Sequence, residues 1–181
     1  MKKLLIYLIL LCLWAPLCWA ADEPFNLRGV VLDMPVNEVL KLEDGKPFVY
    51  KPGDQTAFVD LNENVFGLKA QQARYYLTPE GLVFSVYLDF GKYEFRDPAI
   101  LADYQKLAAG LEALYGTPMF YGSMKTGEII QINVEDLGDL LDEMVLCRAM
   151  WYKDDACMSA NLVNVGGSKQ KHIYILYNYN E

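Results

Sequence analysis

The sequence contains a single histidine, His172, and only four cysteines in 181 residues. A Ser-His-Asp or Cys-His catalytic arrangement would have to use His172. It stands at the start of an expected strand, where we interpret it as an ordinary strand-end residue. Zinc needs three or four ligands. One histidine and two paired cysteines do not provide them. The sequence also has no phosphate-binding loop, dinucleotide fingerprint, nucleophile elbow or paired metal motif. We therefore expect no enzyme and no cofactor.

Basic residues are few relative to acidic ones, 16 against 24, which gives a net charge of −8. Without Lys2 and Lys3 the counts are 14 and 24, a net charge of −10. Such a chain is repelled by nucleic acid and by anionic membrane surfaces, so we expect neither as a partner. No Asn-x-Ser/Thr acceptor occurs, so nothing indicates a glycosylated ectodomain.

The N-terminal segment is typical of a secretory signal peptide. A basic start precedes an apolar run from Leu4 to Leu17, and Cys18-Trp19-Ala20 has small residues at the positions that signal peptidase requires. We expect a cleaved signal peptide over 1–20 and a single periplasmic or secreted domain over 21–181, with no membrane attachment after cleavage. The alternative is an uncleaved anchor, since the charge-free run is at the low edge of the length that spans a membrane.

Cys147 and Cys157 are the cysteines that remain after cleavage, and two cysteines in an oxidising compartment usually pair. A tight hairpin about Lys153–Ala156 would instead place Cys157 opposite Tyr152, roughly 16 Å along the strand from Cys147. A disulfide needs Cα atoms within about 7 Å. We predict a Cys147–Cys157 disulfide with a loose hairpin. The alternative is a tight hairpin with two free thiols.

The stretch from Ala73 to Phe90 predicts a β-hairpin around which the chain assembles. Arg74–Leu77 is its first strand, and Thr78-Pro79-Glu80-Gly81 is a turn because proline presets φ and glycine permits a positive φ. In the second strand every other residue is apolar, so these residues should share a buried face. They are Leu82, Phe84, Val86, Leu88 and Phe90.

Three segments have the pattern of a helix. Val36–Leu42 follows Asp33 as cap, and a longer helix starts at Asp97-Pro98 with apolar residues recurring at helical spacing through Leu114. Val134–Met144 is the third. The other segments are strands joined by turns. The order predicts an α+β fold, with antiparallel sheet packed on two or three helices.

A faint internal repeat accompanies these helices. Gly-x-Pro-x-x-Tyr follows the first helix at Gly45 and the long helix at Gly116. The pattern allows two degenerate half-repeats, over 25–96 and 97–181, that share a core. The alternative is that glycine and then proline simply end many helices.

Leu32-Asp33-Met34-Pro35-Val36-Asn37-Glu38-Val39, followed by Gly45-Lys46-Pro47, resembles the opening of the BamE/SmpA-like bacterial envelope domains. Asp33 stands where those domains have glycine, and their lipidated cysteine is missing. The resemblance implies a small domain of helix and antiparallel sheet that binds other proteins in the cell envelope.

Aromatic residues are the most unusual feature, with 13 tyrosines, many of them on expected strands. An antiparallel sheet often leaves one face free of helices, and aromatic side chains there form a rigid, amphipathic binding surface. We predict that this surface binds another envelope or secreted protein. Its predicted residues are Tyr75, Trp151, Tyr152, Tyr174 and Tyr177. The alternatives are a periplasmic protein that binds a small ligand, and a hydrolase that uses paired carboxylates.

Overall fold

The computed structural model describes residues 24–94, 97, 99–125, 128–130, 146–164 and 170–180. Two helices and nine strands lie within them. The helices are α2 (Val36–Leu42) and α3 (Ala99–Tyr115). The strands are β1 (Phe48–Val49), β2 (Thr56–Val65), β3 (Leu68–Leu77), β4 (Val83–Glu94), β5 (Phe120–Lys125), β6 (Glu128–Ile130), β7 (Leu146–Lys153), β8 (Ala156–Asn164) and β9 (Gln170–Tyr179).

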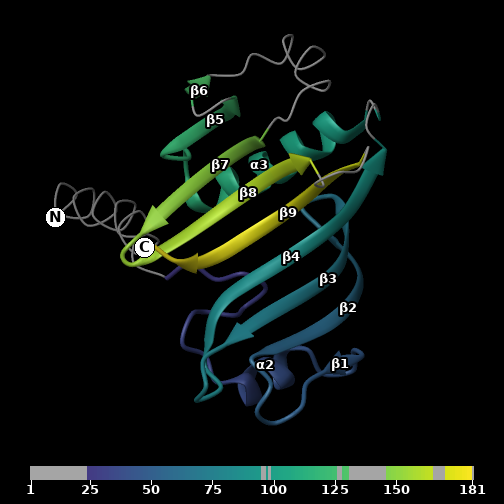
Figure 1. Cartoon of the computed structure of the whole chain (residues 1–181), viewed down its shortest axis with the longest axis vertical. Helices are drawn as coiled ribbons and strands as arrows, with labels where there is room; N and C mark the ends of the chain where they lie inside the picture. The colour runs from purple at the N-terminus through teal and green to yellow at the C-terminus, as the bar shows by residue number, and fades with distance from the viewer. Residues whose placement is uncertain are drawn as a thin grey trace, which may run out of the picture.

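All nine described strands join one antiparallel sheet in the order β1-β2-β3-β4-β9-β8-β7-β5-β6. β4 and β9 lie side by side in its middle, as Figure 1 shows. The strands at the two ends of this order, β1 and β6, have only two and three residues. Short edge strands offer little unpaired backbone to other chains, which limits edge-to-edge association.

The sheet dominates the molecule, so the predicted packing of antiparallel sheet on two or three helices is wrong. Within the described residues a single long sheet has only two helices beside it. The reason is the pairing of β4 with β9, which joins two runs of hairpin-connected strands into one sheet. The third predicted helix, Val134–Met144, lies outside the described residues. The half-repeats over 25–96 and 97–181 stay a prediction.

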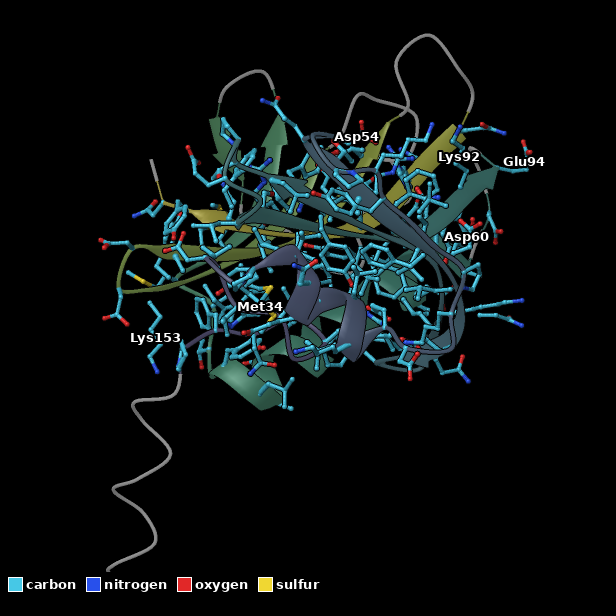
Figure 2. The ribbon with its side chains drawn as sticks, turned by 90° about the horizontal axis from the view of Figure 1, so that it is seen from below. Met34, Asp54, Asp60, Lys92, Glu94 and Lys153 are labelled. Atoms are coloured by element: carbon cyan, nitrogen blue, oxygen red, sulfur yellow. The ribbon has the colours of Figure 1, made fainter. Side chains whose placement is uncertain are left out.

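The two helices span the residues that the sequence predicts, and both lie on one side of the sheet (Figure 2). The predicted cap of α2 is wrong, because its N-cap is Pro35 and not Asp33, and no side chain caps it. At the start of α3 the Asp97 side chain accepts a hydrogen bond from the Ala99 amide at 2.9 Å. Gly45 and Gly116 both have a φ of 80° after the helix ends, a conformation that glycine adopts without strain. No helix in the described ranges has the length and apolar character to cross a membrane.

The β3–β4 hairpin forms as predicted, but a bulge changes which residues of β4 are buried. Tyr76 pairs with Ser85 while Leu77 pairs with Val83, so Phe84 is an extra residue in the ladder. Phe84 is therefore 40% exposed and Val83 is fully buried in its place. Beyond the bulge the predicted alternation holds. Val86, Leu88 and Phe90 are all buried.

The β2–β3 turn packs against α3 at a helix position that has no side chain. A Cβ atom at Gly110 would lie 2.4–2.7 Å from the ring and Cβ of Phe66. Phe66 itself has a φ of 52°, so the turn holds its side chain in place from a constrained backbone. Gly110 thus lets the tip of this hairpin lie directly on the helix.

We expect Gly110→Ala to destabilise the protein by about 1–3 kcal/mol, although alanine normally favours a helix, because the new methyl group overpacks Phe66. Urea unfolding measures the difference. In a Phe66→Gly background, which removes the Cβ as well as the ring of residue 66, the same substitution should be neutral or stabilising, since the clash is gone. Equal destabilisation in both backgrounds would contradict the contact.

The predicted Cys147–Cys157 disulfide is absent, and both residues are free cysteines. β7 and β8 form the tight hairpin, in which Tyr152 pairs with Cys157 and Cys147 pairs with Leu162. The two cysteines are thus five pairs apart, and they also point to opposite faces of the sheet because strand side chains alternate. Burial raises the pKa of the Cys147 thiol to about 11, although the charge of Lys171 acts in the opposite direction.

Candidate binding face

The two faces of the sheet differ sharply in burial. Along β4 and β9, Val86, Leu88, Ile175 and Tyr177 are at most 2% exposed and form the core with the helices. The alternate residues Tyr87, Asp89, His172 and Tyr174 of the same strands are half-buried. α3 packs on the core face, where the Tyr104 hydroxyl donates to the carbonyl of Ala160 at 3.4 Å. The other face has no helix among the described residues over it (Figure 2).

Three of the five predicted binding residues belong to the core, so their assignment to a binding surface is wrong. Tyr75, Trp151 and Tyr177 are 0–2% exposed. Tyr152 and Tyr174 are half-buried and lie on the opposite face. The reason is the two-residue period of a strand: Trp151 and Tyr152 are neighbours, so they must point to opposite faces. Tyr174 and Tyr177, three residues apart, must do the same.

The face away from the helices carries aromatic and charged side chains in two adjoining cross-strand rows. Arg74 pairs with Tyr87, and in the next row Asp89 pairs with Tyr174. Directly paired residues of a sheet share a face and touch. We call this the open face. It is defined by Arg74, Tyr87, Asp89, Arg148, Tyr152, His172 and Tyr174.

A hydrogen-bonded histidine–carboxylate pair lies at the centre of the open face. Nε2 of His172 is 2.7 Å from Oδ1 of Asp89, and the two side chains are 16% and 19% exposed. The Gly91 amide donates to the same oxygen at 2.6 Å. Burial by itself would raise the pKa of Asp89, but the bonds from His172 and Gly91 hold it below its usual value. Asp89 is therefore a carboxylate at neutral pH, and it orients the imidazole.

Aromatic rings stack beside this pair. The rings of Tyr87 and Tyr174 are 4.9 Å apart and inclined by 30°, and the Tyr174 ring is 5.6 Å from that of His172. The Arg74 guanidinium lies over Tyr87 at 5.9 Å from the ring centre. Burial and the charge of Asp89 raise the pKa of Tyr87, so its hydroxyl stays protonated. These contacts hold the side chains in place before any partner arrives.

The row continues across β8 to β7. Asn161 pairs with Tyr174 on one side and with Arg148 on the other. Its side-chain oxygen accepts from Nε of Arg148 at 2.8 Å, and its amide group donates to Oγ of Ser159 at 2.9 Å. Asn161 is fully buried, so it fixes the base of the Arg148 side chain. The half-buried Arg148 is thereby the second arginine of the open face.

Sequence reasoning missed Arg74, Tyr87, Asp89 and His172, and a signal for most of them was present. The predicted hairpin placed its apolar residues at alternate positions, so the polar alternates Tyr87 and Asp89 had to point away from the core. Arg74 is opposite Tyr87 in the same hairpin. His172 had no such signal, because its contact with Asp89 depends on the β4–β9 pairing.

A second polar cluster brings two carboxylates together, the arrangement that a carboxylate-dependent hydrolase would need. Glu43 is 2% exposed and accepts from Arg28 at 2.8 Å, from Lys46 at 2.7 Å and from the Tyr75 hydroxyl. Glu63 pairs with Arg28 and with Lys46. Burial would raise the pKa of Glu43, but the bonds from Lys46, Tyr75 and Arg28 outweigh it and lower the pKa. A lowered pKa suits a structural ion pair and not a general acid.

The open face can therefore bind by stacking, by guanidinium contacts and by hydrogen bonds from tyrosine hydroxyls. Two hydrogen-bonding neighbours of His172 on this face are Asp89 and the un-ionised Tyr87. Among the described residues no group of three or more His, Cys, Asp or Glu side chains could hold a metal ion. Comparison of the chain with protein-family models, with curated proteins and with solved structures finds no match.

Proposed function

We propose that this protein is an exported, non-enzymatic binding module of the bacterial cell envelope, and that its open face binds another envelope or secreted protein. The observation that carries the proposal is the stack of Arg74, Tyr87 and Tyr174 beside the His172–Asp89 pair. Tyrosine and arginine dominate the energetic centres of protein interfaces. Side chains already held by stacking and hydrogen bonding lose little conformational entropy on binding.

Two features of the sequence support the location and the kind of partner. The N-terminal segment has the pattern of a signal peptide, which directs the chain out of the cytoplasm. The stretch from Leu32 to Val39 resembles BamE/SmpA-like envelope domains, and Asp33, which stands where they have glycine, has a φ of 64°. A left-handed conformation is one that glycine adopts readily, so the local backbone suits that motif.

The proposal predicts that open-face variants lose partner binding without losing stability. Tyr174→Ala and Arg74→Ala should each weaken capture of the partner from an envelope extract by tenfold or more, since truncating an interface anchor often costs about 2 kcal/mol or more. Quantitative pull-down with tagged protein measures this. Both variants should unfold within about 1 kcal/mol of the wild type, because neither side chain is in the core.

Leu114→Ala is the matched control. Leu114 is a large, 62% exposed side chain at the end of α3, on the helix side of the sheet. Its truncation should leave capture unchanged. Partner binding that survives both open-face variants, or that Leu114→Ala removes, would contradict the assignment. Recovery of the protein from the cytoplasm with residues 1–20 still attached would contradict export.

A further inference from the structure

A pocket of about 260 Å³ lies at the end of the sheet where the β7–β8 turn meets the C-terminal end of β9 and the segment before α2. Figure 1 shows the C-terminus beside this turn, and Figure 2 labels Lys153 at the same end. Phe25, Leu32, Tyr177 and Tyr179 form the apolar walls. Asp154 and Asp155 of the turn complete the lining and are exposed. The pocket is separate from the open face.

The walls of the pocket are held by contacts of their own. The Tyr177 hydroxyl donates to the carbonyl of Phe25 at 2.7 Å and accepts from the Leu32 amide at 3.4 Å. The ring of Phe25 meets the ring of Tyr177 edge-on, with centroids 6.4 Å apart. The Asn180 amide donates to the carbonyl of Asp155 at 2.6 Å, which ties the turn to the end of β9. The site is therefore formed before a ligand enters.

The size of the pocket limits what it can hold. An apolar cavity of about 150 Å³ accommodates benzene. A volume of about 260 Å³ therefore has room for one ring and a short chain. It is smaller than the roughly 300–1,000 Å³ of sites for drug-sized ligands. The ligand should be a single ring or a branched apolar group with a short substituent.

The charged side chains around the pocket determine which charge that substituent should carry. Asp154 and Asp155 line the rim, and the Asp33 carboxylate accepts a hydrogen bond from the Tyr179 hydroxyl. One cationic side chain, Lys153, also lines the pocket. Burial, and then the nearby Asp33 and Asp155, raise the pKa of Tyr179 to about 12, which agrees with a negative potential there. Carboxylates beside aromatic faces favour a cation, through ion pairing and cation–π attraction.

We propose that this pocket binds a small organic cation, an amine on an aromatic or branched apolar body, with the apolar part against Leu32 and Tyr179 and the amine at Asp155. The apolar walls cover one side of the body of the ligand. The rim carboxylates pair with its charge. The inference assigns the pocket a ligand class and is independent of the protein-binding face.

Titration with phenethylamine, followed by ligand-observed NMR and by calorimetry, tests the inference. Phenethylamine has one ring and a two-carbon arm, and we expect saturable binding with a Kd of roughly 0.1–1 mM, typical for a ligand of this size. The anion 3-phenylpropionate has a similar shape and should bind at least tenfold less tightly. Asp155→Asn should weaken phenethylamine binding by about two- to fivefold, which is the effect of one exposed charge pair.

Asp54→Asn is the matched control, since it removes the same charge from an exposed turn before β2. It should leave the affinity unchanged, which separates a local effect of Asp155 from the overall acidity of the chain. Tyr174→Ala should also leave it unchanged, so failure of the open-face proposal would not affect this result. Equal affinity for the amine and the acid, equal loss in both aspartate variants, or no saturable binding would each overturn the inference.

Discussion

Replacing Glu43 with alanine is expected to lower the free energy of unfolding by about 3–5 kcal/mol, because it leaves the largely buried Arg28 guanidinium and the buried Tyr75 hydroxyl without the buried acceptor that they share. Glu43 is almost fully buried and accepts from Arg28, Lys46 and Tyr75. It thereby joins the N-terminal loop, the end of α2 and β3. Urea unfolding at pH 7 measures the loss.

Glu63→Ala is the matched control for that experiment. Glu63 is the same residue type and pairs with the same two cations, but its side chain is 36% exposed. Removing an exposed partner of an ion pair should cost less than about 1 kcal/mol. Equal losses for the two variants would show that burial of Glu43 does not determine its contribution.

The same network predicts how stability depends on pH. The folded pKa of Glu43 is lowered from 4.5, so its contribution is fully present above about pH 4.5. It is lost progressively as the pH falls from there through the folded pKa. Glu43→Gln cannot ionise and should show a shallower loss of stability below about pH 4.5 than the wild type. Parallel curves for the two proteins would contradict the lowered pKa.

Truncating Trp151 to alanine is the second large effect, and we expect it to cost about 3–5 kcal/mol. Trp151 is 2% exposed, and its Nε1 donates to the carbonyl of Gly116 at 2.6 Å. That bond joins β7 to the end of α3. The substitution leaves a cavity in the core and also an unsatisfied carbonyl at the helix terminus.

Tyr152→Ala provides the comparison, because Tyr152 is the next residue and points to the open face. It should cost no more than about 1 kcal/mol, although its side chain is large. Chemical unfolding of both variants is the measurement. A small loss for Trp151→Ala, or a large one for Tyr152→Ala, would reverse the assignment of the two faces.

Local patterns in the sequence were sufficient to predict where the two helices and the turn of the β3–β4 hairpin lie. Proline beside the helix start and glycine after the end mark both α2 and α3 in the sequence. Apolar spacing identifies the buried side of α3, and Thr78–Gly81 identifies the turn between β3 and β4. These features depend on backbone preferences and on contacts within a few residues, so they can be predicted without knowing the rest of the fold. Leu114 is the exception on α3, since it continues the apolar spacing but is 62% exposed.

Only the tertiary structure decided which residues meet across the sheet. The pairing of β4 with β9 joins residues 83 positions apart and brings Asp89 to His172. One bulge at Phe84 exchanges the buried and exposed positions before Val86, which no local pattern reveals. The tight β7–β8 register separates Cys147 from Cys157. Register and long-range pairing are set by packing of the whole core, and a shift of one residue turns every side chain to the other face.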